Sequence, residues 1–298
     1  MNKSSLVAVL GLLAWSVVST FAGTPLLRYE FDQSGSVQYS TGSSNLSLTT
    51  VYSDGIAHDY ITGTPVRRQG ASTSNALNFT AANVNENGQQ GYGTASASLT
   101  DTNAAFFRSD LESFTISMWV LGLRSDLSNV TPRLLTLRNA GGKDIISLQY
   151  ASGTPNKLTL VLNGAEGQVA LKPSDLAVPV SDTSWFFLSL TYDATTGQVT
   201  FYGGAEGGTL ASEIAFNTVG GNINSLLTDA NLLSIGGVRN IDQRRASGYF
   251  SDVRFYGEAL TATQIGQLYA IPEPSSALIL GIGVVLVSLR CRKTRLSR

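Results

Sequence analysis

The chain has 298 residues, of which 43% are hydrophobic and 14% charged, and its formal net charge is −1. Residues 23–271 hold 14 basic and 20 acidic residues, so this part lacks the basic surface that nucleic acid phosphates require, and we expect no nucleic-acid partner. The single cysteine, Cys291, and the single histidine, His58, exclude an internal disulfide and any metal site built from several such residues.

The first 22 residues have the organisation of a secretory signal peptide. Lys3 supplies a positive charge, the stretch from Leu6 to Val18 is almost wholly apolar, and Thr20-Phe21-Ala22 resembles a small-x-small cleavage site. We therefore predict export, with cleavage after Ala22. An uncleaved membrane anchor is the alternative.

From Leu27 to Asp32, apolar and polar residues alternate. A period of two predicts a strand with Leu27, Tyr29 and Phe31 on one face. The following stretch, Gln33 to Gly93, is rich in Ser, Thr, Gly and Asn, and the sequence predicts little there beyond long loops and short strands, such as 46–52 and 76–79.

Strand patterns then recur at short intervals, separated by turn-forming clusters such as Asn163-Gly164. The predicted strands are Ser113–Val120, Arg133–Leu137, Ile145–Tyr150, Lys157–Leu162, Trp185–Tyr192, Gln198–Tyr202, Asn231–Ile235 and Gly248–Tyr256. Many short strands with almost no helical periodicity predict an all-β antiparallel sandwich.

One short helix is predicted near the end of the strand-rich part. Thr261 and Gln264 have the spacing of a capping box, and Ile265, Leu268 and Tyr269 then form one apolar face. We expect this helix to pack against an end of the sandwich.

Three segments resemble the concanavalin A-like, laminin-G-type jelly-roll domains: Phe114–Val120, Trp185–Gly204 and Gly248–Tyr269. The resemblance extends over roughly Leu26 to Tyr269 and implies one jelly-roll domain at 23–270. Large rings in alternating strands fill space between packed sheets, so Trp119 and Trp185 are expected in the gap between the two sheets.

Many jelly rolls of this kind bind a calcium ion where the first and last strands meet. Calcium requires several oxygen ligands, and Asp32 and Asp252 lie in the corresponding strands. The resemblance therefore suggests that Asp32 and Asp252 hold one structural calcium. Pairing of these carboxylates with Arg28 and Arg254 is the alternative.

Members of the family bind sugars through polar loops. Two loop-like stretches, 88–93 and 239–245, are candidates. Their candidate ligand residues are Tyr92, Asn240, Asp242, Arg244 and Arg245. Arg244 and Arg245 suit an acidic polysaccharide; ordinary solvated loops are the alternative.

Glycoside hydrolases on this fold place several carboxylates on one strand, in patterns such as E-x-D-x-E. Glu30-Phe31-Asp32 begins that pattern, but no third acid follows. We therefore expect a binding protein without enzymatic activity, with an adhesive or carbohydrate-binding role. A passive structural component of an extracellular polymer is the second hypothesis, and a hydrolase is the third.

The chain ends with Pro272-Glu273-Pro274, an apolar run from 275 to 289 and a basic tail from 290 to 298. This order resembles the PEP-CTERM sorting signal, which implies recognition by an exosortase-type enzyme and delivery to the cell surface or extracellular matrix. The apolar run is about 22 Å long as a helix, short for a bilayer core of about 30 Å. We predict a transmembrane helix there that anchors the protein only transiently in the inner membrane.

Overall fold

The computed structural model describes residues 22–270 with several gaps: 52–56, 72, 81–92, 101–103, 110, 125–130, 152–153, 155–156, 165–166, 172–173, 177, 180, 182, 216–225, 228 and 238–243. Residues 1–21 of the predicted signal peptide, the sorting motif Pro272-Glu273-Pro274, the predicted transmembrane helix at 275–289 and the basic tail at 290–298 lie outside the described residues. No helix in the part of the chain that the structure describes is both long and apolar enough to cross a membrane.

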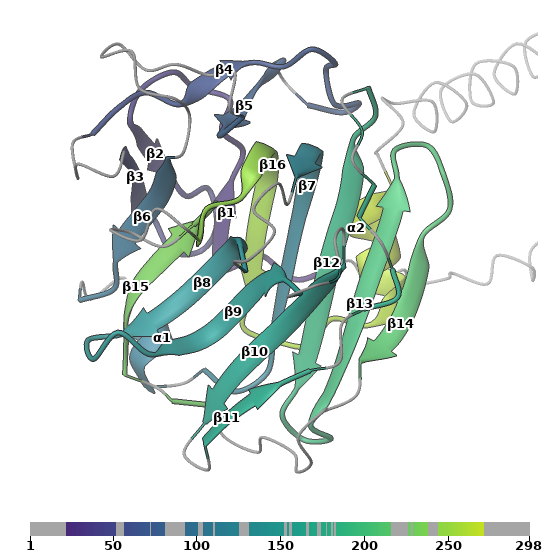
Figure 1. Cartoon of the computed structure of the whole chain (residues 1–298). Coiled ribbons are helices and arrows are strands. Elements are labelled where there is room, and N and C mark those ends of the chain that lie inside the picture. Colours follow the sequence, from purple (N-terminus) through teal and green to yellow (C-terminus); the bar gives the residue numbers. More distant parts are fainter. Residues whose placement is uncertain are drawn as a thin grey trace, which may run out of the picture.

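Two antiparallel sheets of eight strands each pack face to face (Figure 1). Sheet A has the order β14 (Ala211–Ala215), β13 (Gln198–Ala205), β12 (Phe186–Asp193), β7 (Phe114–Arg124), β16 (Ser247–Tyr256), β5 (Asn75–Asn78) and β4 (Ile61–Gly63), with β1 (Leu27–Tyr29) also paired to β16. Sheet B has the order β11 (Gly167–Ala170), β10 (Leu158–Gly164), β9 (Asp144–Tyr150), β8 (Arg133–Asn139), β15 (Ala230–Ile235), β6 (Thr94–Ser98), β3 (Ser47–Val51) and β2 (Val37–Tyr39). The predicted all-β antiparallel sandwich is confirmed.

The main hydrophobic core fills the space between the sheets. In β7, Ile116, Met118 and Val120 point into it, and in β10 Leu158, Leu160 and Leu162 do the same from the other side. Each fully buried side chain of this size contributes about 1.5–3 kcal/mol relative to exposure. Alternation in the sequence thus fixes which face of each strand is buried.

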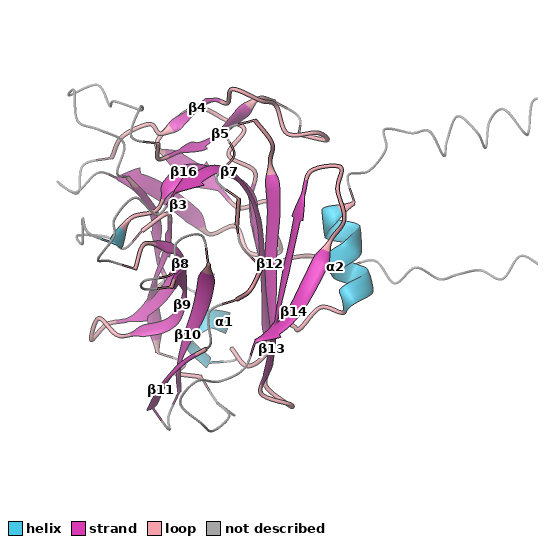
Figure 2. Cartoon of the chain, turned by 45° about the vertical axis from the view of Figure 1, so that its right-hand side comes forward, coloured by secondary structure: helices cyan, strands magenta, loops and turns pink. Residues whose placement is uncertain are grey.

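A second cluster lies on the outer face of sheet A, under α2 (Ala262–Tyr269). Trp119, Trp185 and Phe187 are buried there with Ile265 of the helix, and the Tyr269 ring stacks on Trp119 with ring centroids 6.0 Å apart. Figure 2 shows α2 on the outer side of the sheet that contains β12, β13 and β14.

This cluster corrects two expectations. The two tryptophans are core residues, as predicted, but they do not lie between the sheets. Met118 and Val120 point inward, so Trp119 between them has to point outward. The helix begins with the predicted capping box, in which Thr261 and Gln264 bond reciprocally, but it packs on a sheet face and not on an end of the sandwich.

The predicted strands all occur, whereas five shorter ones were not predicted. These are β2, β4, β6, β11 and β14, with three to five residues each. The first strand ends at Tyr29 and not at Asp32, because Phe31 adopts a left-handed conformation with φ 56°. A further short helix, α1 (Phe106–Ser109), lies outside both sheets.

The packing of the second cluster predicts how much the contact of α2 with sheet A contributes to the free energy of unfolding. Substitution of the fully buried Ile265 by alanine removes its contact with the tryptophans, and we expect the free energy of unfolding to fall by about 2–4 kcal/mol. The exposed Thr263 of the same helix provides the matched control, since Thr263→Ala should change the value by less than about 0.5 kcal/mol. Urea unfolding followed by tryptophan fluorescence measures both; equal effects would contradict the packing described.

Candidate functional site

The outer face of sheet B carries a row of hydroxyl side chains that crosses five strands. Thr49, Ser96, Ser234, Thr136 and Ser147 are register partners from β3 through β6, β15 and β8 to β9. Opposing residues in antiparallel strands point to the same side, so these hydroxyls share one face. We call this face, opposite the main core, the hydroxyl face. Ser96, Ser234, Thr136 and Ser147 are buried on it, and Thr49 at its β3 end is partly exposed.

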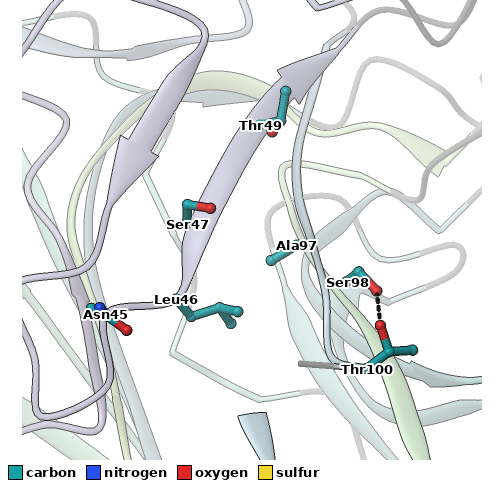
Figure 3. Close-up of a pocket in the computed structure, with 7 residues that line it drawn as sticks. All are labelled: Asn45, Leu46, Ser47, Thr49, Ala97, Ser98 and Thr100. Carbon is teal, nitrogen blue, oxygen red and sulfur yellow. Dashed lines mark hydrogen bonds between the residues drawn. The ribbon is translucent and has the colours of Figure 1, made fainter. Parts of the chain in front are cut away.

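A pocket of about 450 Å³ opens at the β3–β6 end of the hydroxyl face (Figure 3). Its lining is mostly polar and small: Asn45, Leu46, Ser47, Thr49, Ala97, Ser98 and Thr100. The hydroxyls of Ser98 and Thr100 lie 2.9 Å apart and hydrogen-bond to each other. The pocket therefore offers several donors and acceptors without a formal charge.

The edge strand β2 adds an exposed aromatic ring beside this pocket. Tyr39 is the register partner of Ser47, and its side chain is 68% exposed. Between Val37 and Tyr39, Gln38 turns the other way and donates hydrogen bonds to the carbonyls of Gln33 and Gly35. The sequence analysis does not include Tyr39 among its candidate site residues. The alternation Val37-Gln38-Tyr39 could have indicated a short strand with Val37 and Tyr39 on the same side.

At the other side of the hydroxyl face lies a group of arginines, the arginine cluster, centred on Arg133 of β8. The Arg133 guanidinium donates from Nε to Ser147 Oγ (2.9 Å) and to Gln149 Oε1 (3.2 Å), and it pairs with Asp144. Arg138 also pairs with Asp144, with Nε 2.9 Å from Oδ1. Asp144 therefore forms ion pairs with both Arg133 and Arg138.

The structure brings the two predicted ligand-loop arginines to this cluster. Arg245 forms an isolated parallel β-bridge with Arg133, and the positive charge of Arg244 acts on Arg133. The alternative of an ordinary solvated loop does not hold for Arg245, because this residue is only 2% exposed. The other three candidates, Tyr92, Asn240 and Asp242, lie outside the described residues.

The two predicted calcium ligands are in different surroundings. Asp252 is 4% exposed and accepts from Arg28 Nε (3.0 Å) and Arg254 Nε (2.8 Å), while Arg68 Nη2 lies 3.8 Å away. Asp32 offers its backbone carbonyl to the Asn75 side chain. At Asp252 the geometry is that of the alternative, ion pairing with Arg28 and Arg254.

A calcium ion at Asp252 would have to displace these arginines. Among the described residues, no three His, Cys, Asp or Glu side chains gather closely enough to hold a metal ion. The calcium site thus stays a prediction, and the described part of the chain provides no ligand set for it.

The hydroxyl face also bears on hydrolysis. A glycosidase needs two carboxyl groups about 5–9.5 Å apart, one of them with a raised pKa. In the arginine cluster, as far as the structure describes it, the carboxylate is Asp144, which forms ion pairs with Arg133 and Arg138. A single carboxylate does not make the pair that this reaction requires.

Comparison with family models gives one match. A laminin G family of the concanavalin A-like lectin/glucanases superfamily matches residues 87–266. Comparison with curated protein sequences finds no match. The family match covers most of the described sandwich, including β7, β12 and β16.

Solved structures with a similar arrangement have low sequence identity. The binding domain of botulinum neurotoxin DC, solved with rat synaptotagmin II, is 12% identical with a TM-score of 0.48, over 83% of this chain and 51% of that one. The CBM40 of the Ruminococcus gnavus IT-sialidase, bound to α2,3-sialyllactose, is 18% identical with a TM-score of 0.41, over 58% and 90%. Trypanosoma rangeli sialidase is 17% identical with a TM-score of 0.49, over 82% and 32%. The chain spans about half the length of the neurotoxin domain, and none of these likenesses is close enough to transfer a ligand.

The ion pairs of Asp252 predict a specific dependence of stability on pH. Burial by itself would raise the pKa of Asp252, but the hydrogen bond from Arg254 and the charges of Arg254, Arg28 and Arg68 lower it to about 2. A pKa below that of the unfolded chain stabilises the fold above about pH 4, here by about 2 kcal/mol. This stabilisation is lost as the pH falls through about 2.

We expect Asp252→Asn to lower the free energy of unfolding at pH 7 by about 2–4 kcal/mol and to weaken its change between pH 4 and pH 2. Asp175→Asn is the control, because Asp175 makes an exposed ion pair with Lys157 and should cost less than about 1 kcal/mol. Urea unfolding at several pH values measures both. A variant at Asp252 with the stability of the original chain at pH 7 would overturn the assignment.

Proposed function

Because this chain belongs to the concanavalin A-like lectin/glucanases superfamily, we propose that it is an exported carbohydrate-binding protein whose ligand lies on the hydroxyl face. The observation that carries the proposal is the pocket over β3 and β6 with Tyr39 exposed beside it. The family supports the class of ligand, and the pocket supports the location.

The chemistry of the pocket suits a sugar. A pyranose ring has C–H groups on its faces and hydroxyls around its rim, so it combines with a flat aromatic ring and with short polar side chains. Tyr39 supplies an exposed ring with a polar tip, and Ser47, Ser98 and Thr100 supply hydroxyls that both donate and accept. A few polar groups placed around an open concavity are typical of small-molecule sites.

The opposite sheet is less suited to this role. The outer face of sheet A is occupied by α2 and by the tryptophan cluster, whose aromatic rings are buried. The aromatic groups that could stack on a sugar there are thus already used for folding. This supports placing the ligand on sheet B.

We further propose that residues 271–298 are a sorting signal for an exosortase-type enzyme and that the mature protein acts at the cell surface or in the extracellular matrix. The order Pro272-Glu273-Pro274, apolar run and basic tail supports this, together with the export signal at residues 1–22. A basic tail is expected to stay on the cytoplasmic side. The sandwich would then face away from the cytoplasm before processing.

The proposed stacking role of Tyr39 is tested by substitution. We expect Tyr39→Ala to weaken binding of the oligosaccharides found on a glycan array by about tenfold, because loss of an aromatic contact costs about 1 kcal/mol or more. Tyr39→Phe keeps the ring and should bind within about threefold of the original chain. Isothermal titration calorimetry on the exported form measures the affinities.

Ile214→Ala is the matched control for this experiment. Ile214 is a large exposed apolar residue on an edge strand, like Tyr39, but it lies on sheet A. It should leave binding unchanged. Absence of any glycan binding by the unmodified protein would contradict the proposed function, and equal losses for both alanine variants would contradict the location.

The sorting proposal predicts the C-terminus of the surface-located protein. Mass spectrometry of surface material should find no peptides from the part beyond the sorting motif, because the signal is processed at the membrane. Replacing Pro272, Glu273 and Pro274 by alanine should leave the tail attached and the protein in the membrane fraction. Full-length protein in surface material would contradict the proposal.

A further inference from the structure

The pocket lies where the ladder between β3 and β6 opens. The paired residues of these two strands end with Thr49 opposite Ser96, and the same register would next place Ser47 opposite Ser98. The ladder stops before that pair, and both serines line the pocket instead. Each strand stays in sheet B through its other neighbour, because Ser47 pairs with β2 and Ser98 with β15. We call the place where Ser47 and Ser98 face each other the fork.

The backbone groups of both serines point into the fork. Successive residues of a strand direct their N–H and C=O groups to opposite neighbouring strands. The Thr50 N–H donates to the carbonyl of Ser36, on the side of β2, so the backbone groups of Ser47, three residues earlier, face β6. The Leu99 N–H donates to a carbonyl of β15, so those of Ser98 face β3. One N–H and one C=O of each serine thus face the pocket from opposite sides.

The floor of the pocket is apolar. Leu46 and Ala97, the chain neighbours of these serines, belong to the main core and point into the gap from the two strands (Figure 3). An acetamido group has the matching parts, since it carries an N–H donor, a C=O acceptor and a methyl group. It is chemically a peptide group, so it can bond the backbone of Ser47 and Ser98 as a strand residue would, with its methyl on the floor.

The exposed ring of Tyr39 lies at a suitable place for the rest of such a sugar. Tyr39 pairs with Ser47 on the side away from the fork, one strand spacing of about 4.8 Å from β3. Val37, which is 42% exposed, continues the same apolar surface along β2. A pyranose ring stacked on Tyr39 therefore has its substituents within reach of the fork.

We propose that the fork selects sugars that carry an N-acetylated amino group, and that it binds the acetamido group through the backbone of Ser47 and Ser98. This inference rests on the proposed function, because it names the class of sugar that the same pocket would take. A sugar with a hydroxyl in place of the acetamido group has no methyl for Leu46 and Ala97, and it is too short to bond both sides of the fork.

The test compares sugars that differ only in the acetamido group. Three matched pairs serve as probes on the exported form of the chain: chitotriose with cellotriose, N-acetyllactosamine with lactose, and N-acetylgalactosamine with galactose. Isothermal titration calorimetry should show at least tenfold tighter binding of the N-acetylated member in one or more of the pairs. Ligands found on the glycan array should likewise contain N-acetylated amino sugars.

Two variants at Ser47 separate its backbone from its side chain. Proline has no N–H, and it is tolerated at the first residue of a strand, which is the position of Ser47 in β3. Ser47→Pro and Ser47→Ala both lose the hydroxyl, but only Ser47→Pro loses the N–H that faces the fork. We expect Ser47→Ala to keep the preference for the N-acetylated member and Ser47→Pro to reduce it at least fivefold.

A measurement on the unmodified chain decides the matter if Ser47→Pro does not fold. Hydrogen exchange followed by NMR should show that the amide protons of Ser47 and Ser98 exchange at least threefold more slowly when the protein is saturated with the N-acetylated member. Its counterpart with a hydroxyl should leave both exchange rates unchanged at equal saturation.

The outcomes separate this inference from the proposed function. Equal affinities within every pair that binds, or array ligands that all lack an N-acetyl group, would overturn the role of the fork and leave carbohydrate binding standing. So would a preference that survives in folded Ser47→Pro or is lost equally in Ser47→Ala, and so would unchanged exchange at Ser47 and Ser98. Absence of any glycan binding would overturn the proposed function itself.

Discussion

The carboxylate of Asp252 holds together parts of the chain that are far apart in the sequence. Asp252 sits in a bulge of β16 with φ 49°, a left-handed conformation that aspartate tolerates better than most residues. From there it bonds Arg28 of the first strand and Arg254 of its own strand, and it lies near Arg68. Both strands belong to sheet A, where β1 pairs with β16, so this buried ion-pair network fixes the first strand to the last one.

The same network connects to the packing of the outer face of sheet A. The Arg68 guanidinium lies 5.7 Å from the centre of the Trp119 ring, and Trp119 in turn stacks against Tyr269 of α2. The outer face of sheet A is thus covered by the arginine–aspartate ion pairs, by the packed aromatic rings and by α2. The outer face of sheet B has no such helix among the described elements. Its polar side chains line the pocket at the β3–β6 end, whereas Ser234, Thr136 and Ser147 are buried.

The hydroxyl face combines two kinds of surface with different energetic roles. At the β3 side, exposed hydroxyls and the Tyr39 ring are solvated in the free protein, so contacts with a ligand replace water at little cost. At the β8 side, Arg133 and its neighbours have already been removed from water during folding. The β8 side therefore contributes to the fold, and the β3 side is the part of this face that is open to a ligand.

The sequence alone determined the fold class, the main strands and the capped helix, because alternation and capping depend on neighbouring residues. It also identified Trp119 and Trp185 as buried and Arg244 and Arg245 as candidates for one site. Only the tertiary structure decided that the tryptophans lie under α2, that Asp252 pairs with arginines and that Arg245 is buried beside Arg133. The place of Tyr39 was also decided by the tertiary structure, because Tyr39 of β2 lies beside the pocket only through its pairing with Ser47 of β3. The physical reason is that strand pairing and burial depend on contacts between segments far apart in the sequence. A period-two pattern shows which side of a strand a residue occupies, but it does not show which residues of other strands lie beside it.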